Sequence, residues 1–249
     1  MLLAACSHLQ NGYNVRVSNR AYLQIWCREL TAETLPRLLH EFLSTVPFSR
    51  QRAGFTQLVL RAVDTAEAPV LERDLRAAPA DPPGILESLG ESLQLDSEVE
   101  LEAWWDLWVF DPASGLWTEQ PQPLVVFCRA PEFEDALWRD AGHFSADLGF
   151  EHLFTGHGGL LGNGGSVPVR PPAAPSPRHP AEEEFLRSMS QPEKLREYAG
   201  RTRENIRRLQ AWMQRIAQSL PLAAERGIVL SSEGEEDFEA RLDAIEACE

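Results

Sequence analysis

Residues 98–128 read EVELEAWWDLWVFDPASGLWTEQPQPLVVFC, and their pattern decides the fold class. Apolar and polar residues alternate on both sides of DPASG, whose Asp-Pro and Gly are typical of a turn. A period of two is typical of a half-buried strand, because successive side chains point to opposite faces of a sheet. We therefore predict a β-hairpin with strands at about 98–110 and 116–128. Pro121 and Pro123 predict that its second strand is broken or lies at an edge.

Similar patterns predict further elements around this hairpin. Strands are expected at 15–27, at 55–63 and at 143–150. In the third strand, Phe144, Ala146, Leu148 and Phe150 would point inward, and His143, Ser145 and Asp147 outward. Helical spacing predicts helices at 31–46 and 83–93, with a Pro- and Ala-rich connection at 64–82. Helices covering one face of a sheet make a two-layer α+β domain, expected to span 14–155 after an irregular terminus at 1–13.

The composition changes after residue 155. Six of the ten residues at 156–165 are glycine, and six of the thirteen at 168–180 are proline. Because such a stretch cannot bury a core, we interpret 156–181 as a linker. Residues 182–249 are then expected to form a separate helical tail.

The tail contains two apolar stripes of opposite charge. A long helix is predicted at about 192–220, with seven basic and three acidic residues. Its stripe consists of Leu195, Tyr198, Thr202, Ile206, Leu209, Met213, Ile216 and Leu220. The segment 231–249 has eight acidic residues and one arginine, and a short helix is expected at about 235–247. Opposite charge predicts that the two helices pack as a hairpin, and the long helix is the expected contact with a protein partner or a second copy.

The overall composition excludes several function classes. The 249-residue chain has a formal net charge of −15, which argues against binding to nucleic acid or to anionic membranes. No segment approaches the roughly 20 apolar residues of a membrane span. The four cysteines, at 6, 27, 128 and 248, form no CxxC pair, and Lys194 is the only lysine. Buried free thiols and an Arg-rich composition predict a cytoplasmic bacterial protein.

One stretch, GFEHLFTGHGGLLGNGG at 149–165, concentrates residues that can bind metal. His143, Glu151, His152 and His157 are the candidate ligands for a divalent metal. Their spacing matches no metal motif, so only a loop could bring them together. The glycines match no phosphate-binding motif either, which favours an exit from the domain over a nucleotide site.

The most distinctive feature is aromatic. Trp105 shares the predicted core face with Val99, Leu101, Ala103, Leu107 and Val109, whereas Trp104, Trp108 and Phe110 lie on the opposite, polar face. Large rings on a polar face need a cover, because exposed apolar patches of this size mark contacts. The cover could be the chain's own tail, a protein partner, or a sugar ring stacked on the indoles.

These observations favour a non-enzymatic protein-interaction or regulatory module without a cofactor. The partner would bind through the C-terminal helix or through Trp104, Trp108 and Phe110. The alternative is a metal-dependent enzyme with a site near His143, Glu151, His152 and His157.

Overall fold

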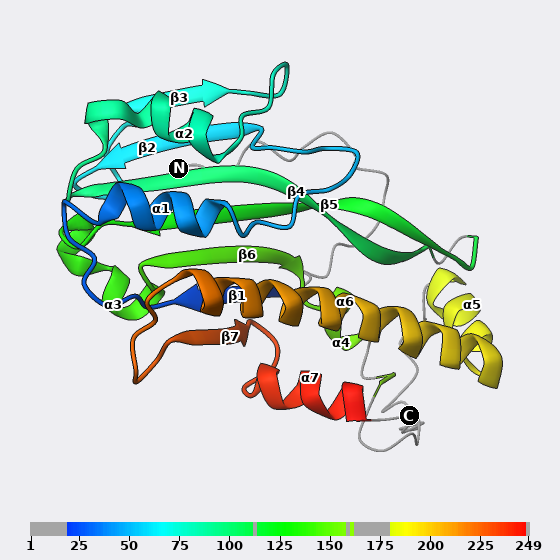
Figure 1. The fold of residues 1–249 in the computed structure, drawn as a ribbon. Helices are drawn as coiled ribbons and strands as arrows, with labels where there is room; N and C mark the ends of the chain where they lie inside the picture. Colours follow the sequence, from blue (N-terminus) through cyan, green and yellow to red (C-terminus); the bar gives the residue numbers. More distant parts are fainter. Residues whose placement is uncertain (1–18, 112–113, 158–159, 162–179, 248–249) are drawn as a thin grey trace.

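The computed structural model describes residues 19–111, 114–157, 160–161 and 180–247. Its centre is an antiparallel sheet of seven strands in the order β3-β2-β4-β5-β6-β1-β7 (Figure 1). The strands are β1 (Arg20–Ile25), β2 (Gln57–Ala62), β3 (Leu71–Asp74), β4 (Ser97–Asp111), β5 (Leu116–Arg129), β6 (Phe144–Phe150) and β7 (Ile228–Ser232). The helices are α1 (Leu35–Leu43), α2 (Pro82–Leu89), α3 (Trp138–Ala141), α4 (His152–Thr155), α5 (Pro180–Met189), α6 (Pro192–Ser219) and α7 (Phe238–Ala247), with short 3-10 helices at Gly90–Ser92 and Phe133–Ala136. The mixed α+β class is confirmed.

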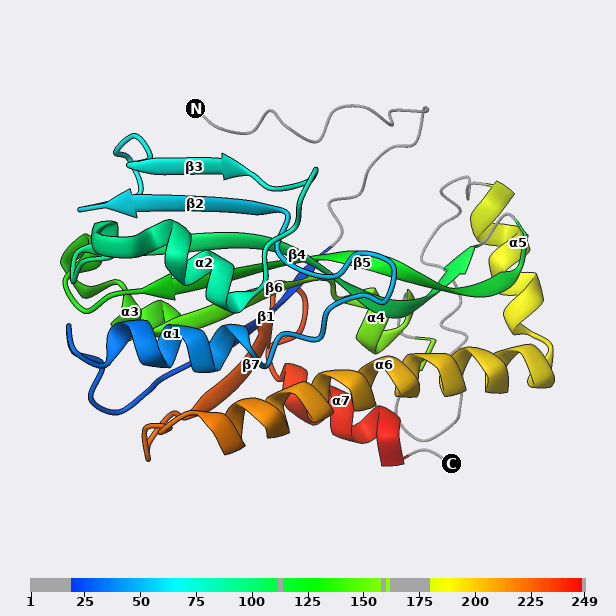
Figure 2. The same cartoon turned by 45° about the horizontal axis from the view of Figure 1, so that its top comes forward.

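Helices α1, α2 and α6 cover the same face of the sheet (Figures 1 and 2). The alternation in β4 explains why the helices pack on this face. The apolar side chains of β4 point towards them and are all buried, as the period of two predicted: Val99, Leu101, Ala103, Trp105 and Leu107. Ring contacts join the two layers. Phe42 of α1 stacks on Phe144 of β6 with centroids 4.6 Å apart, and Trp212 of α6 meets Trp105 edge-on at 6.0 Å.

The β4–β5 hairpin is longer than the strands beside it. Its ladder runs from Glu98 opposite Arg129 to Asp111 opposite Leu116. Strand β2 pairs only with 97–102, and β6 only with 125–128. Beyond these limits β4 and β5 form a two-stranded ribbon, residues 103–111 and 116–124. Pro121 and Pro123 lie in this ribbon, where β5 has no second neighbour among the described strands, so the predicted edge position is confirmed.

The end of β6 differs from the prediction. Phe150 is 43% exposed although simple alternation places it inward. The register shifts between Ala21 and Tyr22 opposite this point, and Gly149 has a φ of +88°. Such an irregularity interrupts the alternation and turns the last side chain outward. His143, predicted to point outward, is instead buried before the strand begins.

The C-terminal region is part of the domain and not a separate tail. Helix α6 has the predicted bounds, and α7 corresponds to the predicted acidic helix. Between them, however, β7 pairs with β1 from Ala21 to Ile25 and becomes the edge of the sheet. Short strands without long alternation resemble loops in sequence, so β7 and β3 were missed. The predicted terminus at 1–13 and most of the predicted linker lie outside the described residues.

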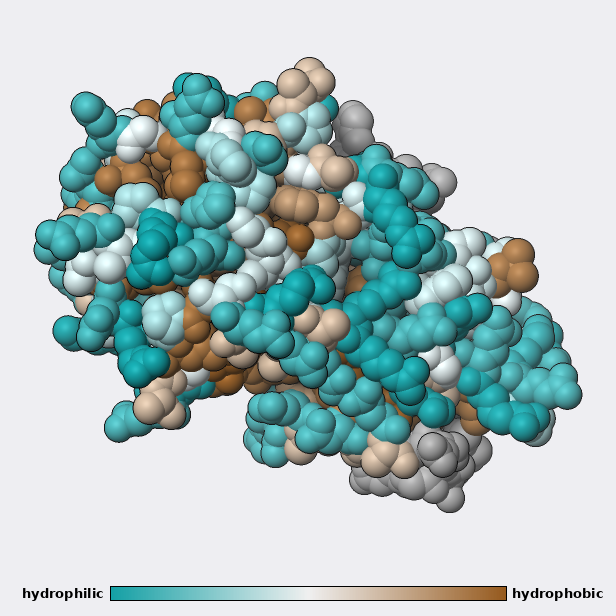
Figure 3. All heavy atoms as spheres, viewed as in Figure 1, coloured by the Kyte–Doolittle hydropathy of each residue, from teal (hydrophilic) through white to brown (hydrophobic). Residues whose placement is uncertain are grey.

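The apolar stripe of helix α6 faces the sheet. Tyr198, Thr202, Ile206, Leu209, Ile216 and Leu220 are buried as predicted. The opposite side of the helix is hydrophilic (Figure 3). Helices α6 and α7 lie together, and Arg207 and Gln210 of α6 both reach Glu246 of α7. This contact is the predicted pairing of a basic with an acidic helix.

Candidate functional site

The free edge of the ribbon is closed by side chains of α6 and by the backbone of a loop. In antiparallel strands, alternate residues direct their backbone groups to the same edge. Beyond β2, Trp104 O accepts from Ser49 N at 2.6 Å, and the Asp106 carbonyl accepts from Arg208. At Trp108, both backbone groups bond to the amide of Asn205. Hydrogen bonds from α6 and the loop therefore satisfy backbone groups of β4 that would otherwise bond to a neighbouring strand.

The tip of the ribbon carries a small apolar cluster that is distinct from the main core. We call it the aromatic cluster; its buried members are Phe110, Phe185, Met189 and Tyr198, with Trp117 packed against them. The Tyr198 ring lies 5.8 Å from Phe110, 5.1 Å from Trp117 and 5.7 Å from Phe185. Tyr198 comes from α6 and Phe185 from α5, so the two helices and the ribbon meet at this cluster.

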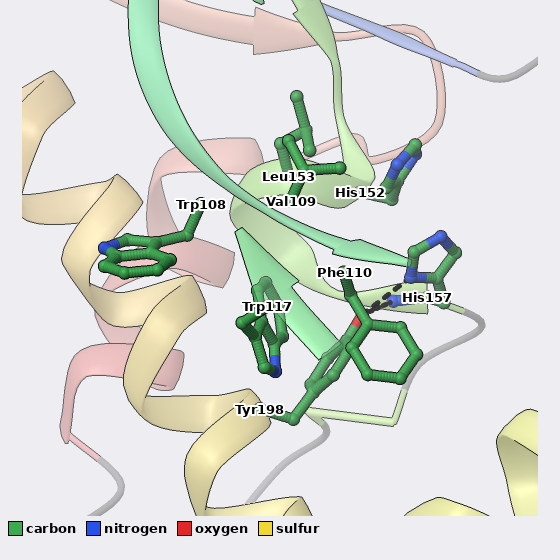
Figure 4. Close-up of a pocket in the computed structure, with 8 residues that line it drawn as sticks. All are labelled: Trp108, Val109, Phe110, Trp117, His152, Leu153, His157 and Tyr198. Atoms are coloured by element: carbon green, nitrogen blue, oxygen red, sulfur yellow. Dashed lines mark hydrogen bonds between the residues drawn. The ribbon is translucent and has the colours of Figure 1, made fainter. Parts of the chain in front are cut away.

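A small hollow opens beside the aromatic cluster (Figure 4). Its lining consists of Trp108, Val109, Phe110, Trp117, His152, Leu153, His157 and Tyr198. The enclosed space is about 10 Å³, which is the room of a single water molecule.

Two histidines and a tyrosine form the polar part of this hollow. The Tyr198 hydroxyl accepts from the backbone N–H of His157 at 2.9 Å and is hydrogen-bonded to Nδ1 of the same residue at 2.7 Å. The rings of His152 and His157 lie 4.2 Å apart. Burial lowers the pKa of His152 to about 3, with a further contribution from His157, and burial also lowers the pKa of His157. Burial raises the pKa of Tyr198. All three groups are therefore neutral near pH 7.

The four predicted metal ligands lie in two places. His152 and His157 are neighbours, but His143 stacks on Trp138 at 4.2 Å at the other end of β6. Nδ1 of His143 accepts from Cys27 N, and a carboxylate oxygen of Glu151 accepts from Gly234 N. Among the described residues, no three His, Cys, Asp or Glu side chains are placed to hold a metal ion.

Of the three rings predicted to bind a partner, two pack against helices of the chain itself. Phe110 is buried in the aromatic cluster. The guanidinium of Arg201 lies 3.7 Å from the centroid of Trp108, which sits beside α6 (Figure 4). Only Trp104 remains on a sheet face that no described helix covers. The tail thus provides the cover that was one of the predicted alternatives.

Arginines lie over the aromatic rings of this uncovered sheet face. Arg52 is 4.2 Å from the centroid of Trp104, and Arg129 is 5.0 Å from that of Phe127. At the end of β6, Arg20 lies 5.7 Å from Phe150. Two of these arginines are also ion-paired, Arg129 with Glu98 at 2.8 Å and Arg20 with Asp147 at 2.7 Å. The half-exposed rings are thus held in an ordered layer of arginine and carboxylate.

Several residues that organise these regions were not predicted from the sequence. Asn205 lies within the apolar stripe of α6 and is fully buried. A polar residue at a core position is the signal that could have identified it, because a buried amide needs partners. The arginine contacts have no local signal, since each joins residues that are distant in sequence.

Two remaining expectations are answered in part. Cys27 and Cys128 are buried free thiols, as predicted. Within the described part of the chain, no helix has the length and apolar character needed to cross a membrane.

Comparison of the chain with protein families, with curated proteins and with solved structures finds no match.

Proposed function

We propose that this protein is a non-enzymatic protein-interaction module that binds its partner with the uncovered face of the sheet. The observation that carries the proposal is the layer of Trp104, Phe127 and Phe150 under Arg52, Arg129 and Arg20. Tryptophan and arginine are among the residues that contribute most of the binding energy at protein interfaces.

The order within this layer also supports a protein partner. Ion pairs with Glu98 and Asp147 hold Arg129 and Arg20 in place, so less side-chain entropy is lost when a partner binds. A sugar ring would need the indole face of Trp104, which Arg52 already occupies. A protein surface can instead contact the outer side of the guanidinium groups.

The test compares the full-length protein with its Trp104→Ala variant as baits for partner capture from native extracts. Trp138→Ala serves as the matched control, because this tryptophan is also half-buried but lies outside the sheet. We expect Trp104→Ala to lose the captured protein while its thermal unfolding midpoint stays close to that of the wild type. Equal capture by the wild type and Trp104→Ala, or the same loss with Trp138→Ala, would contradict the proposal.

A further inference from the structure

Helix α5 covers the ribbon tip with a short apolar stripe. Phe185, Ser188 and Met189 are buried at the i, i+3 and i+4 positions of one helix face. The Phe185 ring lies 5.4 Å from Phe110 and 5.4 Å from His157. It therefore fills a groove whose walls are the ribbon, the residue after α4 and Tyr198 of α6.

This contact contains no polar link. The only ion pair of α5 within the described chain joins Glu184 to Arg187 of the same helix, and its C-terminal hydrogen bonds stay within 186–191. The hydroxyl of Ser188 is buried without a partner, which costs about 1–3 kcal/mol for such a group. A ten-residue helix is also marginal on its own in water. The association of α5 thus rests on apolar contacts in the aromatic cluster.

The charges around the groove favour an acidic occupant. Helix α5 carries three glutamates and one arginine, whereas α6 beside it carries seven basic and three acidic residues. The same electrostatic attraction acts on any acidic helix that approaches this groove.

We infer that α5 is a displaceable internal ligand, and that the groove under it binds an acidic amphipathic helix of a partner through an aromatic side chain in the position of Phe185. The inference rests on the proposed interaction function but concerns a different surface. Binding of a helix in an apolar groove through residues at i, i+3 and i+4 is an established mode of recognition. In the closed state α5 competes at high effective concentration, because it belongs to the same chain.

The probe for this groove is a fluorescent synthetic peptide of residues 180–190, PAEEEFLRSMS. The receptor is full-length protein with Phe185→Ala, which weakens its own α5. This variant is expected to fold because the aromatic cluster is distinct from the main core. By fluorescence anisotropy, we expect the peptide to bind Phe185→Ala at least 10-fold more tightly than the wild type. The same peptide with Phe185→Ala should not bind either protein.

Two further variants make the result specific. Adding Phe110→Ala to Phe185→Ala removes one wall of the groove and should abolish binding. Adding Phe150→Ala removes an exposed ring of the sheet face and should leave binding unchanged. Equal affinity for the wild type and Phe185→Ala, no binding to a folded Phe185→Ala, or retained binding after Phe110→Ala would overturn the inference. Since none of these measurements involves Trp104, they leave the proposed sheet-face function to its own test.

Discussion

The side-chain amide of Asn205 takes the place of a β-strand beside Trp108. Oδ1 of Asn205 accepts from Trp108 N at 2.8 Å, and Nδ2 donates to Trp108 O at 2.9 Å. The same Nδ2 donates to Leu153 O at 2.9 Å, so one buried residue joins α6, the ribbon and α4. Three partners around one amide explain why a polar residue is tolerated within the apolar stripe of α6.

Replacing Asn205 should therefore destabilise the whole domain. We expect Asn205→Ala to lower the free energy of unfolding by about 2–4 kcal/mol, because backbone groups of Trp108 and Leu153 lose their partners in a buried site. Urea denaturation followed by circular dichroism measures the change. Glu204→Ala is the matched control on the preceding, more exposed position, and should have a much smaller effect. A cost below about 1 kcal/mol for Asn205→Ala would contradict the role assigned to the amide.

Protonation of His143 should weaken the fold at acidic pH. Burial lowers the pKa of His143 to about 4, and its Nδ1 accepts a hydrogen bond from Cys27 N, which requires the unprotonated nitrogen. The unfolded chain has a histidine pKa of about 6.5. The stability that neutral His143 contributes is thus complete above pH 6.5 and is lost as the pH falls towards 4.

The comparison uses urea denaturation of the wild type and His143→Gln at pH 7.5 and pH 5. At pH 7.5 the difference between them reports the packing and hydrogen bond of the neutral ring. We expect this difference to shrink at pH 5 by an amount on the order of 1–2 kcal/mol, since only the wild type has a histidine here whose protonation stabilises the unfolded chain at this pH while the buried ring stays neutral. A difference that is constant or that grows on acidification would show that His143 does not titrate in this way.

An unfavourable backbone conformation at Val63 offers a stabilising substitution. Val63 has a φ of +73°, which is costly for a β-branched residue, and its side chain is 57% exposed. Glycine adopts this conformation without strain. We therefore expect Val63→Gly to raise the free energy of unfolding by about 1 kcal/mol, and with it the unfolding midpoint. Val70 is the matched control, because it is 59% exposed but has no positive φ. Differential scanning calorimetry should show Val70→Gly with an unchanged or lower midpoint; a lower midpoint for Val63→Gly would exclude strain at this residue.

The arginine over Trp108 should contribute measurably to the docking of α6. We expect Arg201→Ala to cost about 1 kcal/mol, the usual size of a partly exposed cation–π contact, and to change the fluorescence of Trp108. Arg196→Ala removes an exposed arginine from the same helix and should have little effect on either property. Equal effects of the two substitutions would mean that the contact with the indole adds no stability.

Local patterns were sufficient to predict most elements of the sheet layer and the helix α6. The period of two in β4 identified its buried residues, and the spacing of three and four in α6 identified the side that packs on the sheet. Both patterns are properties of neighbouring residues, so they are visible before the chain folds. The hairpin and the edge position of Pro121 and Pro123 follow from the same local information.

The contacts that form the candidate sites could not be predicted from these local patterns. His152 and His157 were predicted only as two of four candidate metal ligands, and the contact of His157 with Tyr198 joins positions 41 residues apart. Trp104 was identified as a ring that needs a cover, whereas Arg52 could not be named as that cover. The sequence by itself determined where strands and helices form and which sides of them are apolar, because these depend on residues within one or two turns. Only the tertiary structure decided that β7 completes the sheet, that Asn205 closes the ribbon edge and that α5 lies over the aromatic cluster, because each of these depends on pairings between distant segments that no local periodicity encodes.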